Sequence, residues 1–265
     1  MKTNYHTHTY RCKHATQWDE SYVKAAVRAH FDELGFSDHS PWPYPNKFRS
    51  FIRMDNFMLD DYIESLTELK QRYKDVLSIK IGLECEYFDD YMPWLTEQVE
   101  ARKLDYVIFG NHFYKDDSKY PEYFGHSIVD KENLEIYLES ILKGMEYKKF
   151  AYVAHPDLFI NSYKYFDVAC EKASRQICEK AYKLGLPLEF NLSGYRIRGA
   201  RHTTKTYPYE SFWKIAADCG CTCIIGYDAH DPKYIASDAF LNKGLKEIKK
   251  LGLKRIERIG FLTDK

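Results

Sequence analysis

Residues 2–14 read KTNYHTHTYRCKH, a short strand-like run followed at once by three histidines, and this unit sets the pattern for the chain. Later segments repeat it, each placing a histidine or a carboxylate at or just after a short apolar run. They are SDHS with His39, GLE with Glu84, GNHF with His112, AHPD with His155, and YDAH with Asp228 and His230. Since polar residues scattered at random would not keep to strand ends, we expect these side chains to share one site.

Short apolar runs alternate with amphipathic segments along the chain. The predicted strands are residues 2–5, 34–37, 77–83, 106–110, 150–154, 186–190 and 221–226, and the predicted helices are residues 20–33, 56–74, 131–148, 167–184 and 209–218. This alternation indicates a parallel sheet that is covered on both faces. Seven strands in one domain, residues 1–265, favour an α/β fold of the TIM-like (β/α)7 barrel type over an open sheet. In such barrels the chemistry lies at the carboxyl ends of the strands.

Two segments stand outside this alternation. Residues 40–55 carry three prolines and several aromatic side chains. The segment is too long for a simple connector and too apolar to be disordered, so we expect a packed lid over the site. Residues 255–262 could add an eighth strand or pack across the bottom of the barrel, and the sequence leaves that choice open.

The overall charge and composition exclude several classes of partner. Lys and Arg together number 39, as do Asp and Glu, so the formal net charge is zero. Proteins that hold nucleic acid by its phosphates carry a basic excess, so we expect no nucleic-acid partner. No apolar signal segment precedes His6, and no apolar run approaches the roughly 18 residues of a membrane span. Seven scattered cysteines indicate reduced thiols, which predicts a cytoplasmic protein.

The imidazoles and carboxylates predict a centre with more than one metal ion. His6 and His8 are two residues apart and therefore project from the same face of a strand, where both can bind one ion. Glu84 ends an apolar run in which an unpaired carboxylate would be costly, which favours a carboxylate that bridges two ions, with Glu86 as the competing candidate. So many imidazoles exceed what one tetrahedral ion uses, and they suit Zn, Fe or Mn. Neighbouring ions of this kind activate a bridging hydroxide for in-line displacement at phosphorus.

Taken in order, the motifs HTH, SDH, GLE, GNH, HPD and DAH resemble those of the PHP (polymerase and histidinol phosphatase) superfamily. Within it, HTHTYRCKHA, SDHSP, GLECEY, GNHF, AHPDL and NLSGYR are similar to the monofunctional histidinol-phosphate phosphatases. The resemblance implies a distorted seven-stranded (β/α)7 barrel with three divalent metal ions, zinc first, with iron or manganese as alternatives. It implies one ion at His6, His8, Glu84 and Asp228, a second at Glu84, His112 and His155, and a third at His14, His39 and His230.

The run EFNLSGYRIRGAR, residues 189–201, supplies positive charge for a phosphate group. Arginine can bind a phosphate dianion through two parallel hydrogen bonds. The resemblance implies that Arg196, in SGYR, contacts the phosphate. Arg198 and Ser193 are further candidates, in what we expect to be a loop with a turn at Ser193 and Gly194.

Two residues are candidates for protonating the leaving alkoxide. His202 lies close to the arginines in the sequence, and Asp157 lies in AHPD. Asp157 and Asp38 are also candidates for orienting ligand imidazoles, since a metal-bound histidine usually donates its other N–H to a carboxylate or a carbonyl. His30 and His126 have no such context, and we expect both to be structural.

The resemblance implies hydrolysis of a small phosphomonoester, L-histidinol phosphate, to L-histidinol and inorganic phosphate in histidine biosynthesis, with a metal-bridging hydroxide as nucleophile. Two other enzyme classes stay open. The same site could act on another small phosphomonoester, a nucleotide or a DNA 3′ end, or the His-x-His pair could belong to an amidohydrolase-type deaminase. A metal-binding module without catalysis is the remaining class, and the complete set of ligands argues against it.

Overall fold

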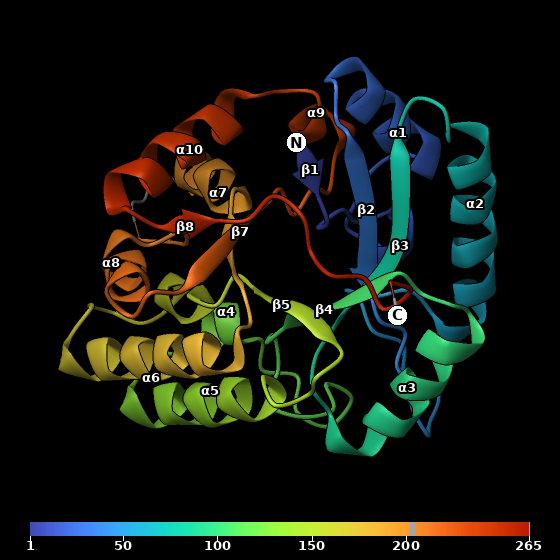
Figure 1. Cartoon of the computed structure of the whole chain (residues 1–265). Helices are drawn as coiled ribbons and strands as arrows, with labels where there is room; N and C mark the ends of the chain where they lie inside the picture. Colours follow the sequence, from blue (N-terminus) through green and yellow to red (C-terminus); the bar gives the residue numbers. More distant parts are fainter. Residues whose placement is uncertain (202–204, 265) are drawn as a thin grey trace.

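Eight parallel strands form the sheet that carries the site (Figure 1). They are β1 (Thr3–Asn4), β2 (Glu33–His39), β3 (Ser78–Cys85), β4 (Tyr106–Gly110), β5 (Phe150–Ala154), β6 (Leu188–Asn191), β7 (Thr222–Gly226) and β8 (Lys254–Arg255), each paired with the next along the chain. A parallel bridge between Thr7 and Ala229 joins the residues after β1 to those after β7, so the curled, TIM-like sheet meets itself there. The computed structural model describes residues 1–201 and 205–264.

The last strand corrects the prediction of seven strands. β8 pairs through only two residues with the start of β7. The chain then crosses the amino ends of the strands, where Ile259 and Phe261 join a cluster of buried side chains inside the barrel. Thr3 donates a hydrogen bond to the carbonyl of Glu257, so the chain just beyond β8 also contacts β1. Residues 255–262 therefore do both things that the sequence left open.

The longer helices lie outside the sheet (Figure 1): α1 (Asp19–Arg28), α2 (Leu59–Arg72), α3 (Met92–Ala101), α5 (Lys131–Gly144), α6 (Val168–Leu184), α8 (Glu210–Asp218) and α10 (Ala239–Leu251). Their ends follow from local chemistry. The side chain of Asp167 accepts hydrogen bonds from the first N–H groups of α6, and Gly185 ends that helix with a φ of 63°, which glycine adopts without strain. None of the described helices is long and apolar enough to cross a membrane.

Two differences from the predicted helices have local causes. The first helix ends at Arg28 and does not reach Glu33, because His30 takes a φ of 55° and Glu33 already begins β2. His30 thus ends a helix, whereas His126 lies in the short helix α4 (Phe124–Ser127). Helices α3 and α10 were not predicted, although both cover the sheet.

The segment after β6 is a helix and not the expected loop. This helix, α7 (Ser193–Arg201), begins where the N–H of Ser193 donates to the side-chain oxygen of Asn191 at 2.9 Å. A Cβ atom at Gly194 would lie 1.6 Å from the carbonyl oxygen of Tyr207, so only glycine lets these two chains approach. The helix fixes the direction of Arg196 and Arg198, which lie within it.

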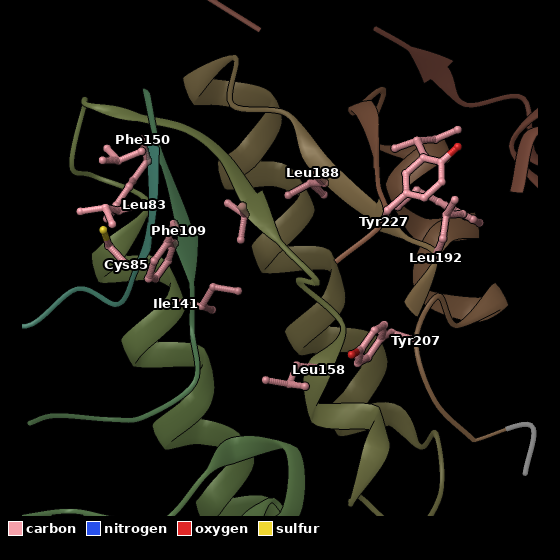
Figure 2. Packing of buried hydrophobic residues seen from close by; sticks show 14 of the residues in the cluster. Leu83, Cys85, Phe109, Ile141, Phe150, Leu158, Leu188, Leu192, Tyr207 and Tyr227 are labelled. Carbon is pink, nitrogen blue, oxygen red and sulfur yellow. The ribbon is translucent and has the colours of Figure 1, made fainter. Parts of the chain in front are cut away.

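The main core lies between the sheet and its helices, and Figure 2 shows one part of it. Phe109 of β4 and Phe150 of β5 stack with ring centroids 5.0 Å apart, and Ile141 of α5 lies near them. A Cβ atom at Gly144 would lie 2.1 Å from the ring of Phe109, so glycine lets α5 lie close to the sheet. Each fully buried side chain of this size contributes roughly 1.5–3 kcal/mol. This packing holds the strand ends, and hence the site, in place.

Residues 40–55, which we call the lid segment, pack onto the barrel as expected. Apart from bends they have no regular structure, yet Trp42 and Met54 belong to the main core cluster. The indole of Trp42 packs against the rings of Phe88 and Tyr91, with centroids 5.4 and 5.8 Å away. The lid segment is therefore anchored at both of its ends.

Candidate metal centre

The structure brings the predicted metal ligands together at the carboxyl ends of the strands. His6 and His8 follow β1, His14 follows the next turn, His39 ends β2, Glu84 lies in β3, His112 and His155 follow β4 and β5, and Asp228 and His230 follow β7. Several overlapping groups of their ligand atoms lie within 4.8 Å of one another. All are buried except His14, which is exposed, and His230, which is half-buried.

Two ligands have a strained backbone. His155 and Asp228 have φ values of 29° and 47°, in the left-handed region that favours glycine. Such a conformation costs about 1–3 kcal/mol and persists only where the surroundings impose it. Here the N–H of His155 donates to the carboxylate of Glu189 at 3.0 Å, and the residue after Asp228 pairs with the chain at His6. The fold therefore maintains a costly geometry at the positions that turn two side chains into the centre.

Glu84 stands between two groups of imidazoles. Its Oε1 lies 3.3 Å from Nε2 of His112 and 3.1 Å from Nε2 of His155. Its Oε2 faces the other group, at 3.3, 3.4 and 3.1 Å from Nε2 of His6, Nε2 of His8 and Nδ1 of His39. Each carboxylate oxygen thus has its own set of nitrogen neighbours, which is the arrangement of a carboxylate that bridges two ions.

Asp228 contributes to the same centre from the opposite side. Its Oδ1 lies 3.6 Å from Nε2 of His6, 3.4 Å from Nε2 of His8 and 3.3 Å from Nδ1 of His230. Nε2 of His230 lies 2.9 Å from Nε2 of His14. The ligand set therefore continues without a break to the exposed edge of the centre.

The spacing of these atoms fits divalent metal ions. Ligands about 2.0–2.1 Å from a tetrahedral zinc lie roughly 3.3 Å from one another, close to the separations found here. Without an ion the contacts would be unfavourable. Nε2 of His6 and Nε2 of His8 face each other at 3.1 Å, and among the described residues neither Oε2 of Glu84 nor Nδ1 of His39 forms a hydrogen bond. Imidazoles with a few carboxylates suit zinc, iron or manganese.

The charges of the centre also favour a cation. Burial alone would raise the pKa of Glu84, but the neighbouring imidazoles, led by His6, hold it well below its usual range. Burial lowers the pKa of His39 well below its usual range, which leaves a neutral ring that can bind metal. Burial would also lower the pKa of His6, but Glu189 and Glu84 raise it to about 10. A metal ion would take the place of that proton.

The carboxylate of Glu189, which the sequence did not single out, holds His6. Its Oε1 accepts a hydrogen bond from Nδ1 of His6 at 2.7 Å, and its Oε2 accepts one from the side-chain amide of Asn191 at 2.8 Å as well as the one from His155. A Cβ atom at Gly226 would lie 1.7 Å from Oε1, so glycine makes room for this carboxylate. The signal in the sequence was an acidic residue inside the apolar strand LEF.

Glu86 and Asp38 lie behind two other imidazoles. Glu86, the competing candidate for a metal ligand, instead accepts a hydrogen bond from Nδ1 of His112 at 2.9 Å, on the side of the ring away from Glu84. Asp38 lies 3.4 Å from Nδ1 of His8. These positions are those of carboxylates that orient ligating imidazoles and fix their tautomers.

Asp157 lies apart from this arrangement. Its Oδ2 accepts hydrogen bonds from the N–H of Tyr209 at 2.7 Å and from Nε1 of Trp213 at 3.2 Å, at the start of α8. Burial raises its pKa to about 6. Among the described residues it is not one of those that line the pocket above the metal ligands. Its visible contacts anchor a helix.

A pocket of about 470 Å³ opens above the ligands, and Arg196 and Ser193 form part of its wall. Nη2 of Arg196 donates to the hydroxyl of Ser193 at 3.0 Å, and the guanidinium lies over the ring of Tyr234, 5.2 Å from its centroid. Ile52 of the lid segment also lines the pocket. The pocket thus combines a cation, a hydroxyl and an apolar side chain next to the candidate metal ligands.

The structure does not bring all the candidates for the phosphate side into this pocket. Arg198 turns away and donates hydrogen bonds to the carbonyls of Thr206 and Pro208. His202 lies outside the described residues. His126, expected to be structural, is exposed and lines the pocket.

Comparisons with known proteins identify similar sequences and a similar fold. The profile of the PHP domain matches residues 4–193. The probable histidinol-phosphatase of Deinococcus radiodurans is 27% identical over 263 residues, which covers 93% of this chain and 92% of the relative. The histidinol-phosphatase of Bacillus subtilis is 27% identical over 276 residues, which covers 92% and 99%.

A solved structure shows the same fold. The histidinol phosphate phosphatase of Lactococcus lactis, in complex with Zn, L-histidinol and phosphate, matches with a TM-score of 0.74 at 19% identity, over 98% of this chain and 97% of that one. Because the PHP profile spans well over half of the 265 residues, the chain belongs to the PHP domain family.

Proposed function

We propose that this protein hydrolyses L-histidinol phosphate to L-histidinol and inorganic phosphate, as a step of histidine biosynthesis. The observation that carries the proposal is the position of Glu84, whose two oxygens face separate groups of imidazoles on the floor of a pocket that also contains Arg196. The organic part of the substrate is taken from the names of the similar proteins, which are probable histidinol-phosphatase, histidinol-phosphatase and histidinol phosphate phosphatase.

We further propose that the ligand set holds three divalent ions. We assign one to His6, His8, Glu84 and Asp228, a second to Glu84, His112 and His155, and a third to His14, His39 and His230. Bound ions would supply an activated hydroxide for in-line attack on phosphorus and would neutralise charge on the phosphoryl oxygens. The buried carboxylates keep the imidazoles in the tautomer that leaves a nitrogen free for metal.

The other residues of the pocket bind and orient the substrate. Arg196 presents its guanidinium next to the hydroxyl of Ser193, so the two can hold non-bridging oxygens of the phosphate as charge builds up on them. The pocket of about 470 Å³ suits a small phosphomonoester better than a polymer. The seven cysteines are free thiols, as expected in the cytoplasm, where we propose that the enzyme acts.

Phosphate release tests the proposal. The protein, purified with added zinc, should release phosphate from L-histidinol phosphate with a higher kcat/KM than from nucleoside monophosphates, sugar phosphates or an oligonucleotide with a 3′-phosphate. Strong chelation should abolish the activity and added metal should restore it, while Glu84→Gln should stay inactive in both conditions. A higher kcat/KM on a nucleotide or a DNA end would contradict L-histidinol phosphate as the substrate. Release of ammonia without release of phosphate would contradict phosphate hydrolysis as the reaction.

A further inference from the structure

A fully buried arginine connects the lid segment to the metal centre. Arg53 is 0% exposed. Its Nη1 and Nη2 donate to the two carboxylate oxygens of Glu86 at 2.9 and 3.1 Å, so the pair is bidentate. Nη1 also donates to the carbonyl of Ser40 at 3.3 Å, and Nη2 donates to Asp117 at 3.1 Å. One guanidinium thus joins the start of the lid segment, strand β3 with its extension, and the loop after β4.

Asp117 and Glu86 gather further groups of the lid segment around this guanidinium. The hydroxyls of Tyr44 and Ser50 donate to Asp117, the second of these at 3.2 Å. Nε1 of Trp42 donates to Glu86 at 2.8 Å. The side chains of the lid segment therefore converge on two buried carboxylates, and the positive charge of the guanidinium makes that burial tolerable.

The same Glu86 holds a predicted metal ligand. Its Oε1, which accepts from Arg53, also accepts from Nδ1 of His112. A proton on Nδ1 leaves the lone pair of Nε2 directed at Oε1 of Glu84 and Nε2 of His155, both 3.3 Å away. Since Arg53 donates hydrogen bonds to both oxygens of Glu86, it fixes the plane of the carboxylate and therefore the direction of the His112 ring.

We propose that Arg53 is a positioning residue that makes the metal site of Glu84, His112 and His155 depend on the docked lid segment. It acts through Glu86 and touches neither metal nor substrate. The next residue back, Ile52, lines the substrate pocket, so the same guanidinium sets a wall of the pocket and one imidazole on its floor. The inference rests on the metal centre of the proposed function and adds to it the group that couples lid and metal.

Metal affinity of folded variants tests this inference. Arg53→Met and Glu86→Gln should each lower the affinity for one zinc ion by about 10–100-fold in a chelator competition. This is the range observed when the hydrogen-bond partner of a ligating histidine is lost. Arg53→Lys keeps the positive charge but loses the bidentate hydrogen bonds. Its zinc affinity should lie between that of Arg53→Met and that of the wild type. The double variant Arg53→Met/Glu86→Gln should lose little more than either single variant, because both act on the same ring.

Asp105→Asn is the matched control. Asp105 is also a buried carboxylate paired with a cation, Lys70 at 2.7 Å, but it lies at the amino end of β4, away from the centre. The Asp105→Asn substitution should lower the Tm without changing the zinc affinity. Unchanged affinity in Arg53→Lys and Glu86→Gln, or an equal loss in Asp105→Asn, would overturn the inference. If Arg53→Met fails to fold, the zinc affinities of Arg53→Lys and Glu86→Gln decide whether the inference holds. Fewer than two zinc ions in the wild type would instead overturn the proposed centre itself.

Discussion

Replacing Glu189 by glutamine exchanges one carboxylate oxygen behind the metal ligands for an NH2 group and should still cost metal affinity. The side chain is fully buried and accepts three hydrogen bonds, one at Oε1 from His6 and two at Oε2 from His155 and Asn191. Glutamine has the same shape but offers one oxygen and one NH2 group. The amide must therefore place its NH2 group toward donors that need an acceptor, whichever way it turns.

Both orientations of the amide are unfavourable. With NH2 at the Oε2 position, it faces the N–H of His155 and the amide of Asn191, and two buried donors lose their acceptor. With NH2 at the Oε1 position, it faces Nδ1 of His6, which must give up its proton, so Nε2 then carries the hydrogen and points it toward Glu84. That tautomer cannot bind metal through Nε2.

The expected cost is about 10–100-fold in zinc affinity, or roughly 1.4–2.8 kcal/mol. A chelator competition on folded protein measures the affinity, and phosphate release at limiting zinc should fall in parallel. Glu33→Gln is the matched control, since Glu33 is a buried carboxylate at the other end of the barrel that accepts from Tyr5 and Ser78. The Glu33→Gln protein should bind zinc as tightly as the wild type. If the Glu189→Gln protein does so too, the role given to Glu189 is refuted.

Three more substitutions separate metal binding, phosphate binding and folding. Gly110→Ala places a Cβ atom 2.4 Å from Oε1 of Glu84 and 2.6 Å from the ring of His112, so elemental analysis should show fewer ions per chain, and a full complement would contradict this geometry. Arg196→Met should lower kcat/KM about 10–100-fold in phosphate-release assays with metal content unchanged, because it removes a charged hydrogen bond; an unchanged kcat/KM would exclude the contact. Asp157→Ala leaves two donors at the start of α8 unpaired and should cost about 3 kcal/mol in urea unfolding with kcat kept within a few-fold. Loss of kcat at unchanged stability would instead support Asp157 as a proton donor.

The sequence predicted the parts of the fold that depend on short-range pattern. Apolar runs alternating with amphipathic segments gave the parallel order of the strands, because that periodicity depends only on which face of each element is buried. The sequence left an eighth strand open, because the two residues of β8 are too few to show a period-two pattern. The end of α1 at Arg28 depends on the left-handed turn at His30, a residue without any turn preference strong enough to be seen in advance.

The part of the site that lies at the strand ends could be predicted from the sequence. The candidate metal ligands were found because most of them lie at or just after the end of a strand, and parallel strands bring their carboxyl ends to one edge. Glu189 and Arg53 were missed because their partners are distant in the sequence: Glu189 meets His6 from 183 residues away, and Arg53 lies in an irregular segment. Arg198 resembled a phosphate ligand in sequence, but α7 turns it toward the carbonyls of Thr206 and Pro208.

The number of metal ions bound per chain decides whether the centre is multinuclear. In the proposed centre the carboxylate of Glu84 would lie between two ions, with a third at the exposed edge near His14. Elemental analysis of freshly purified protein, with Glu84→Gln and His230→Ala as comparisons, should find two to three zinc, iron or manganese ions per wild-type chain, and fewer in each variant. One ion or none in a folded, freshly purified wild-type protein, unchanged after incubation with zinc, would contradict the multinuclear centre.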